Sequence, residues 1–204
     1  GTPRPKNITT VKPSGTLSKI MDTTEGVHKP LGKYIINNVV FSKFDLVVPK
    51  LRGAGYKVFD HPFDKESVLV ALPVKWDTVE FDVVNGMEVN LESAIDQLER
   101  YKMLMVNWCQ QNVSATISYD VDEVPVIIDW LLNNWDNYVG VSFLFRNDPT
   151  KTAADLGYPY LPQEVVTKEV FEKYVAGIVD FELDETTVSD TLDDDCATGM
   201  CPIR

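Results

Sequence analysis

The sequence predicts an α/β fold, and three observations support this prediction. Short β-branched runs alternate with longer segments of helical periodicity along most of the chain, a pattern typical of strands joined by helices. The 204 residues are 44% hydrophobic and 25% charged, an ordinary globular composition that allows a sizeable core. Only 11 glycines and 12 prolines occur. This composition excludes a collagen, a coiled coil and a wholly disordered chain.

The elements predicted in the first part of the chain are short. Residues 1–12 are polar and proline-rich, and Val11–Thr16 follows as a short strand that ends in a turn of small residues. Tyr34–Phe41 is apolar and β-branched, which predicts a buried strand. Asp45–Arg52 is predicted as a helix because glycines follow it directly. The other expected elements here are a helix start, Leu17–Met21, and two strands, Lys57–Phe59 and Val68–Val74.

The second part of the chain is predicted to repeat a helix-then-strand scheme. A long helix is expected over Leu91–Trp108 with Asn90 as its N-cap. Another helix is expected to start after Asp122 as N-cap, with Pro125 in its first turn, and to run to about Trp135. The remaining expected elements are the strands Asn112–Ser118 and Val139–Phe145 and a last helix, Thr167–Ala176. This alternation predicts right-handed crossovers between parallel strands.

Acidic residues concentrate near the C-terminus. The formal net charge is −12, and eight acidic residues without a basic one lie between Asp180 and Asp195, so residues 1–179 carry only −5. We therefore expect a folded body over residues 1–179 and a flexible acidic tail over residues 180–204. A solvated, self-repelling linker is the simplest interpretation of the acidic run. This charge balance disfavours nucleic acid as a partner of either part.

The sequence predicts a cytoplasmic protein with no membrane partner. No run approaches the roughly 18 to 20 apolar residues of a membrane span, and residues 1–30 lack the pattern of a signal peptide. The chain begins with Gly1 rather than Met, as a processed, split or truncated polypeptide would. His28 and His61 stand alone in expected loops, and three cysteines are too few for a four-thiolate zinc site or a disulfide scaffold. We therefore expect no metal site.

The first candidate site is the turn Lys12-Pro13-Ser14-Gly15-Thr16, between a predicted strand and a predicted helix start. Glycine lets the backbone approach a ligand closely, and free N–H groups at the start of a helix favour an anion such as phosphate. Lys12 would add positive charge. The spacing is not that of a Walker motif. An ordinary tight turn accounts for the same residues, so both interpretations stay open.

The second candidate is the terminal pair Cys196 and Cys201. Four intervening residues, including Gly199, allow the two thiols to meet and to store or release two electrons by thiol–disulfide exchange. A disordered acidic tether would let this dithiol visit a buried site and then an external reductant. A purely structural disulfide is the alternative, but little fold remains there for it to staple.

The polar stretch Trp108–Thr116 allows two interpretations. Its amides and hydroxyls follow the end of a predicted helix and enter a predicted strand. They could line a pocket at the edge of a sheet, or they could cap the helix and pair across the sheet. Their spacing favours the second interpretation.

Six motifs lie in order along nearly the whole chain, from about Ile8 to Arg204. They are Thr10–Thr16, Glu25–Pro30, Gln110–Thr116, Phe145–Thr152, Gly157–Glu164 and Cys196–Arg204. Together they resemble the C-terminal part of the adenosylcobalamin-dependent (class II) ribonucleoside-triphosphate reductases.

The resemblance implies the C-terminal part of a ten-stranded α/β barrel. In that family a thiyl radical, generated by cobalt–carbon homolysis of adenosylcobalamin, removes the 3′ hydrogen of a ribonucleotide. The resemblance further implies that Pro13, Ser14, Gly15 and Thr16 hold the phosphates of a ribonucleoside triphosphate. It implies that Cys196 and Cys201 re-reduce the active-site disulfide before thioredoxin reduces them. Cobalamin contacts are expected within residues 30–91 and 150–189, and the candidate side chains are Lys151, Tyr158 and Tyr160.

The resemblance also implies a missing part. The radical cysteine of the family, its glutamate partner, the cysteines oxidised in each turnover and the allosteric region all belong to sequence upstream of this chain. Nothing around Cys109 matches the radical-cysteine loop. We therefore expect an upstream N-terminal segment as a partner, and no turnover by this chain alone. A second hypothesis is a non-catalytic remnant that binds nucleotide or cobalamin, or exchanges disulfides with thioredoxin.

Overall fold

The computed structural model describes residues 3, 7–14, 18, 21, 23–148 and 151–182. Within it the chain divides into two compact units, which are described separately below. Unit 1 comprises Gly1–Lys33, Trp76–Val84 and Glu88–Asp148, and unit 2 comprises Tyr34–Lys75, Asn85–Met87 and Pro149–Arg204. Helices and strands occur in both units, so the mixed α/β content predicted from the sequence is confirmed.

Unit 1 contains a parallel strand–helix–strand motif. Strand β6 (Thr116–Tyr119) pairs in parallel with β7 (Ser142–Phe145), and helix α4 (Val124–Asn133) connects them. Just before β6, Val113 forms an isolated parallel bridge with Val11. The predicted alternation of strand, helix and parallel strand is therefore confirmed for this part of the chain.

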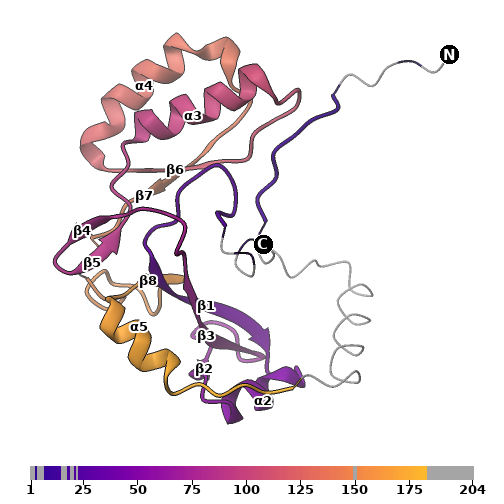
Figure 1. Cartoon of the computed structure of the whole chain (residues 1–204), viewed down its shortest axis with the longest axis vertical. Helices are drawn as coiled ribbons and strands as arrows, with labels where there is room; N and C mark the ends of the chain where they lie inside the picture. The colour runs from indigo at the N-terminus through magenta and orange to yellow at the C-terminus, as the bar shows by residue number, and fades with distance from the viewer. Residues whose placement is uncertain are drawn as a thin grey trace. The chain divides into compact units, whose positions relative to one another are not determined.

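Helices α3 (Ala94–Asn107) and α4 lie together on one side of the β6–β7 pair (Figure 1). The core between them contains Leu98, Tyr101, Ile117 and Trp130, all of which are buried. Burying an apolar side chain of this size contributes about 1.5 to 3 kcal/mol. Two 3₁₀-helices flank α4, namely η1 (Val121–Glu123) and η2 (Trp135–Asn137).

Both predicted N-caps in unit 1 are wrong, by three residues for α3 and by one for α4, whose N-cap position is Glu123. Helix α3 begins after Ser93, whose hydroxyl accepts a hydrogen bond from the N–H of Asp96. Asn90 is instead buried and donates its side-chain amide to the carbonyl of Lys29 at 3.2 Å. Asp122 does not cap α4, because a capping box of Asp120 and Glu123 starts the preceding 3₁₀-turn. A residue that suits a cap can thus be used for a contact distant in sequence.

Unit 2 is built on a four-stranded sheet in the order β2-β3-β1-β8. The strands are β1 (Tyr34–Ser42), β2 (Val58–Asp60), β3 (Ser67–Lys75) and β8 (Gln163–Val165). All three pairings are antiparallel, and β1 and β3 pair along their full length from Tyr34↔Lys75 to Ser42↔Ser67. The expectation of parallel strands is therefore wrong in this unit. The short connection between β2 and β3 suits an antiparallel hairpin and is too short for a parallel crossover.

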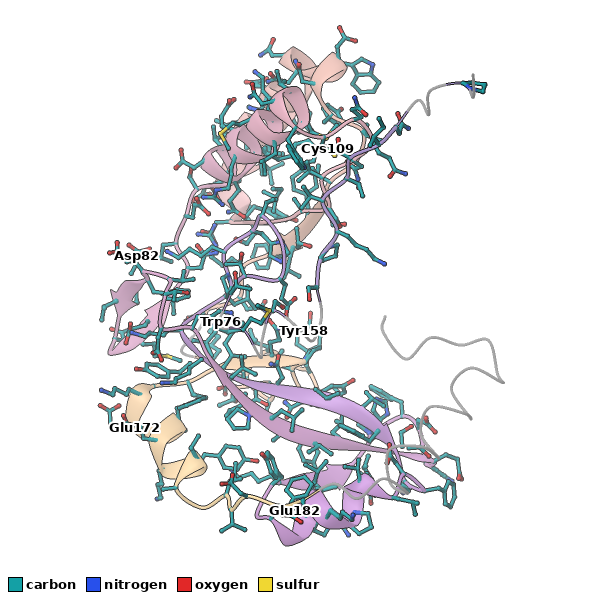
Figure 2. All side chains as sticks on the ribbon, turned by 45° about the vertical axis from the view of Figure 1, so that its right-hand side comes forward. Trp76, Asp82, Cys109, Tyr158, Glu172 and Glu182 are labelled. Atoms are coloured by element: carbon teal, nitrogen blue, oxygen red, sulfur yellow. The ribbon has the colours of Figure 1, made fainter. Side chains whose placement is uncertain are left out.

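Two helices pack in unit 2. Helix α2 (Val47–Gly53) buries Val48 and Leu51 in a cluster with Val68 and Val70 of β3. Helix α5 (Lys168–Val175), orange in Figure 1, buries Phe171, whose ring lies 5.2 Å from that of Tyr34. On the same helix, Glu172 is exposed and ends away from the sheet in Figure 2. The two helices follow the predicted segments Asp45–Arg52 and Thr167–Ala176 to within two residues at each end.

A short hairpin formed by β4 (Asp82–Val84) and β5 (Met87–Val89) was not predicted. Its two-residue turn is Asn85-Gly86, with φ of +50° and +79°. Asn-Gly is the preferred pair for a turn in which both central residues have positive φ. The signal was present in the sequence, but the flanking strands of three residues each are too short to stand out.

Candidate functional site

The segment that leads into the small-residue turn is fixed along the start of the β6 segment. The N–H of Val11 donates to the carbonyl of Asn112 at 3.2 Å, and the N–H of Ser114 donates to the carbonyl of Val11 at 2.9 Å. The carbonyl of Thr9 accepts the N–H groups of Gln110 and Gln111, each at 3.2 Å. The residues before the turn therefore run parallel to residues 110–114.

The polar side chains of residues 108–116 serve this pairing. The Oε1 of Gln110 accepts the N–H of Ile8 at 3.0 Å, and the Oδ1 of Asn112 accepts the hydroxyl of Tyr101 at 3.0 Å. The hydroxyl of Thr9 donates to the carbonyl of Trp108 at 2.6 Å. The interpretation that these residues pair across the sheet is therefore confirmed for them.

The turn itself begins at Lys12, directly after Val11, which forms the bridge with Val113. Pro13 and Ser14 follow. Lys12 and Pro13 are exposed. The N–H of Ser14 donates to the carbonyl of Glu25 at 2.6 Å, and the Oγ of Ser14 accepts the N–H of Ser18 at 3.2 Å. Ser18 is buried and helical. Ser14 thus joins the end of the paired segment to a helical residue, and the N–H groups of both Ser14 and Ser18 are engaged within the chain.

His28 lies beside Gly26 and was not recognised from the sequence as more than a loop histidine. A Cβ on Gly26 would lie 3.5 Å from the His28 ring and 3.4 Å from the carbonyl of Ser114. The Nδ1 of His28 is buried and has no hydrogen-bond partner among the residues that the structure describes. Burial, opposed by Glu25 and assisted by Arg100, lowers the pKa of His28 below its usual 6.5. The imidazole is therefore a neutral polar group at physiological pH.

Arg146 forms an ion cluster at the carboxyl end of β7. One terminal nitrogen pairs with Asp120 at 3.1 Å, and the other donates to the carbonyls of Glu92 at 2.9 Å and Ser118 at 3.2 Å. The side chain is only 12% exposed. This is the edge at which α/β sheets bind ligands. Both terminal nitrogens are matched by protein oxygens and hold the ends of β6 and β7 together, whereas the buried Nε has no hydrogen-bond partner among the described residues.

In unit 2, the predicted residues Lys151 and Tyr158 belong to a compact loop. The N–H and hydroxyl of Thr152 both donate to Asp155, at 2.9 Å and 2.7 Å, and the N–H of Tyr158 donates to the carbonyl of Ala153 at 2.8 Å. The side chain of Lys151 is exposed, and Tyr158 is 54% exposed. Figure 2 labels Tyr158 on this loop.

Tyr160 is held by a histidine far away in the sequence. The Nδ1 of His61 accepts the N–H of Asp64 at 3.0 Å, which places the ring proton on Nε2. Nε2 can then donate to the Tyr160 hydroxyl, 3.3 Å away. The two rings meet edge to face with their centroids 5.5 Å apart. Sequence reasoning placed His61 in a loop correctly but gave no signal for this partner.

The other predicted site residues lie outside the described residues. These are Gly15 and Thr16 of the turn and the cysteine pair Cys196 and Cys201. Among the residues that are described, no group of three or more His, Cys, Asp or Glu could hold a metal ion. The Cys109 thiol is buried at the end of α3, 3.5 Å from the carbonyl of Thr9 (Figure 2). In the same part of the chain no helix is long and apolar enough to cross a membrane.

Several curated proteins are similar to nearly the whole chain. The adenosylcobalamin-dependent ribonucleoside-triphosphate reductase of Levilactobacillus brevis is 29% identical over 202 residues, which cover 96% of this chain and 26% of that protein. The probable adenosylcobalamin-dependent ribonucleoside-triphosphate reductase of Dictyostelium discoideum is 29% identical over 208 residues, covering 98% and 26%. No family model matches. The chain thus spans about a quarter of the length of these relatives.

The fold is also similar to that of a solved reductase. The crystal structure of a B-12 dependent (class II) ribonucleotide reductase matches 90% of this chain with a TM-score of 0.66 and 25% sequence identity. The match covers 24% of the solved chain. The resemblance predicted from the six motifs is therefore confirmed: in sequence and in fold, the chain is similar over almost all of its length to about one quarter of an adenosylcobalamin-dependent, class II ribonucleotide reductase.

Proposed function

We propose that this chain is the C-terminal segment of an adenosylcobalamin-dependent ribonucleoside-triphosphate reductase, and that it acts beside an upstream polypeptide. One observation carries the proposal. The alignment with the reductase of Levilactobacillus brevis covers 96% of this chain but only 26% of that reductase. The product would be a 2′-deoxyribonucleoside triphosphate. The reaction would take place in the cytoplasm, where thiols are kept reduced.

The turn from Pro13 to Thr16 would bind the substrate phosphates. Supporting this role, Ser14 connects a paired extended segment with the helical Ser18. Backbone N–H groups at the start of a helix attract anions. Because the N–H groups of Ser14 and Ser18 are engaged within the chain, this role would fall to those of the residues between them. The exposed ammonium of Lys12 adds a positive charge beside the turn.

Lys151, Tyr158 and Tyr160 would contribute to the cobalamin surface. Adenosylcobalamin has a broad ring with amide side chains and a phosphate. The exposed ring of Tyr158 suits an apolar face, the hydroxyl of Tyr160 suits an amide, and the ammonium of Lys151 suits a phosphate. The donor chemistry therefore fits the cofactor. When bound, the cofactor supplies the radical that starts the reaction, and His61 keeps Tyr160 oriented.

Cys196 and Cys201 would return electrons to the active site. Reducing one ribonucleotide to a deoxyribonucleotide and water oxidises two active-site cysteines of the upstream polypeptide to a disulfide. One thiolate of the Cys196–Cys201 pair attacks that disulfide, and the second thiolate resolves the mixed disulfide. Two electrons pass to the active-site cysteines. Thioredoxin then reduces the Cys196–Cys201 disulfide and is itself oxidised.

Strand β7 supports the need for an upstream partner. All four of its residues are exposed, among them Phe143, Leu144 and Phe145. Within the described residues β7 pairs only with β6. Parallel strands are normally covered on both faces and continued at their edges. An upstream polypeptide that completes the barrel would cover this apolar edge.

The transfer of electrons by Cys196 and Cys201 from thioredoxin to the active site, here called the shuttle role, is tested with two reductants. The chain is mixed with the upstream polypeptide and adenosylcobalamin, and deoxyribonucleotide formation is followed with thioredoxin or with a small dithiol. Cys196→Ser combined with Cys201→Ser is expected to abolish multiple turnovers with thioredoxin and to spare turnover with the small dithiol. Equal loss with both reductants would exclude the shuttle role. If the wild-type mixture makes no product with either, the chain is better described as a non-catalytic remnant.

A further inference from the structure

The outward side of α4 carries an uninterrupted apolar row that continues into the 3₁₀-turns on either side. Its members, here called the α4 stripe, are Val121, Val124, Ile128, Leu132 and Trp135. They are spaced three or four residues apart, so they share one face of the helix. Their exposed fractions are 64%, 37%, 51%, 67% and 70% respectively.

The opposite side of α4 already faces the core of unit 1. Ile127 and Trp130 are buried there, and the indole of Trp130 donates to Glu99 of α3 at 2.6 Å. A helix at the surface of a finished protein is polar on its outer side, whereas a helix that is apolar all round is buried. A contiguous exposed apolar row of this kind marks an interaction surface. The α4 stripe is therefore left uncovered by the described residues and has the character of an interaction surface.

The charges beside the α4 stripe restrict what can cover it. Asp122, Asp129 and Asp136 are exposed and recur every seven residues, so they form an acidic row along one side of the stripe. No Lys, Arg or His occurs anywhere between Met103 and Phe145. A second copy of α4 would bring the same acidic row and no cation from this region. The acidic residues from Asp180 to Asp195 carry the same sign and are disfavoured as a cover for the same reason.

We propose that the α4 stripe is a docking surface for an apolar helix that carries Lys or Arg along one side, and that this helix belongs to the upstream reductase polypeptide. The inference rests on the proposed function. The relatives are about four times as long as this chain, so most of their length, which could supply the cover, lies outside the matched part. If a further strand joins the free edge of β7, the helix attached to that strand packs in the same layer as α4. Basic side chains on it would meet the acidic row.

The test measures the dissociation constant of this chain with the upstream polypeptide of the same organism, at low and at high salt. The stripe variant, Ile128→Ser with Leu132→Ser, is expected to raise the dissociation constant at least tenfold at both salt concentrations, because it removes buried apolar contact. The charge variant, Asp129→Lys with Asp136→Lys, is expected to raise it at low salt and to approach wild type at high salt. Met103→Ser, an equally exposed apolar position of α3, is the matched control and should bind like wild type.

The changed residues are exposed, so thermal unfolding of each variant alone should match that of the wild-type chain. Wild-type affinity of the stripe variant, in a mixture that still reduces nucleotides, would overturn the docking surface and leave the proposed function intact. Failure of the wild-type mixture to bind or to reduce nucleotides would overturn both. A dimer of this chain alone that the stripe variant abolishes would assign the surface to a second copy and would overturn the inference.

Discussion

Gly55 shows how a single residue constrains unit 2. Its φ is +96°, and an added Cβ would overlap the carbonyl oxygen of Gly177. The neighbouring backbone is tied by a hydrogen bond from the N–H of Val179 to the carbonyl of Ala54 at 2.9 Å. Residues 54–55 and 177–179 therefore approach each other in a way that only glycine permits at position 55.

Gly55→Ala is expected to destabilise unit 2 by more than about 1 kcal/mol. Alanine disfavours the positive φ at position 55, and its Cβ would overlap the carbonyl of Gly177. Gly53→Ala is the matched control, because a Cβ there meets nothing within 4 Å and lies in α2. The control should be neutral or slightly stabilising. Amide hydrogen exchange of β1 and β3 measures the difference, and equal protection in the two variants would contradict this account.

His28 makes the stability of unit 1 depend on pH. Because burial lowers its pKa below the unfolded value of 6.5, the folded state binds a proton less readily than the unfolded state. The stabilisation from the neutral ring is therefore full above pH 6.5 and is lost as the pH falls below it toward the folded pKa.

His28→Gln removes this titration and keeps a polar side chain. We compare the free energies of unfolding of the wild type and the variant. The excess of the wild type over the variant is expected to decrease as the pH is lowered from about 7 to about 5. Urea titrations followed by tryptophan fluorescence at several pH values measure this difference. A difference that stays constant with pH would show that His28 does not titrate as its burial requires.

Tyr158 tests the proposed cobalamin surface. Tyr158→Ala is expected to weaken adenosylcobalamin binding by the assembled reductase about fivefold to tenfold, the effect of losing an aromatic contact of about 1 kcal/mol. Trp108→Ala, which removes a similarly exposed aromatic ring of unit 1 outside both expected cobalamin regions, is the control. Equal binding by wild type and both variants would remove Tyr158 from the site.

Sequence reasoning succeeded at single residues where the signal is local. Ser14 follows a paired segment and contacts the next helical residue, as its place in a turn of small residues predicts. The sequence did not predict the contact between His61 and Tyr160, because these residues lie 99 positions apart and neither belongs to a periodic pattern. The buried Nδ1 of His28 was missed for the same reason, since the burial comes from distant segments.

At the scale of elements, helix periodicity and β-branched runs predicted most of the helices and strands, but not their pairing. The β1 and β3 strands were expected individually, whereas their antiparallel register over nine residues depends on which segments meet in space. The strand β8 has three residues and was not expected. Short strands are defined by their partner rather than by their own sequence.

The start of α3 gives an element-scale prediction. Ser93→Ala removes the hydroxyl that accepts the N–H of Asp96, so the free energy of unfolding is expected to fall by about 1 kcal/mol. Ser93→Thr keeps the N-cap hydroxyl, which also donates to the Asp96 carboxylate at 2.7 Å, and should recover most of the loss. Urea unfolding of the two variants and the wild type measures both effects. Equal stability of Ser93→Ala and wild type would mean that this cap contributes nothing.

At the scale of the whole molecule, the chain has two compact units and matches about a quarter of the proteins that it resembles. The six motifs predicted that match from the sequence alone. The composition gave no sign of the division into two units, because their boundaries at Lys33 and Trp76 fall between continuous structured segments. Within the described residues, β7 and the α4 stripe leave apolar surface of unit 1 exposed.

The most direct test of the central claim is the rate at which 2′-deoxyribonucleoside triphosphate forms from a ribonucleoside triphosphate. The mixture contains this chain, the upstream polypeptide, adenosylcobalamin and reduced thioredoxin, and each component is omitted in turn. We expect product only in the complete mixture. Product formation at the same rate without this chain, or none when all components are present and the two polypeptides bind each other, would contradict the proposal that the chain is a working segment of the reductase.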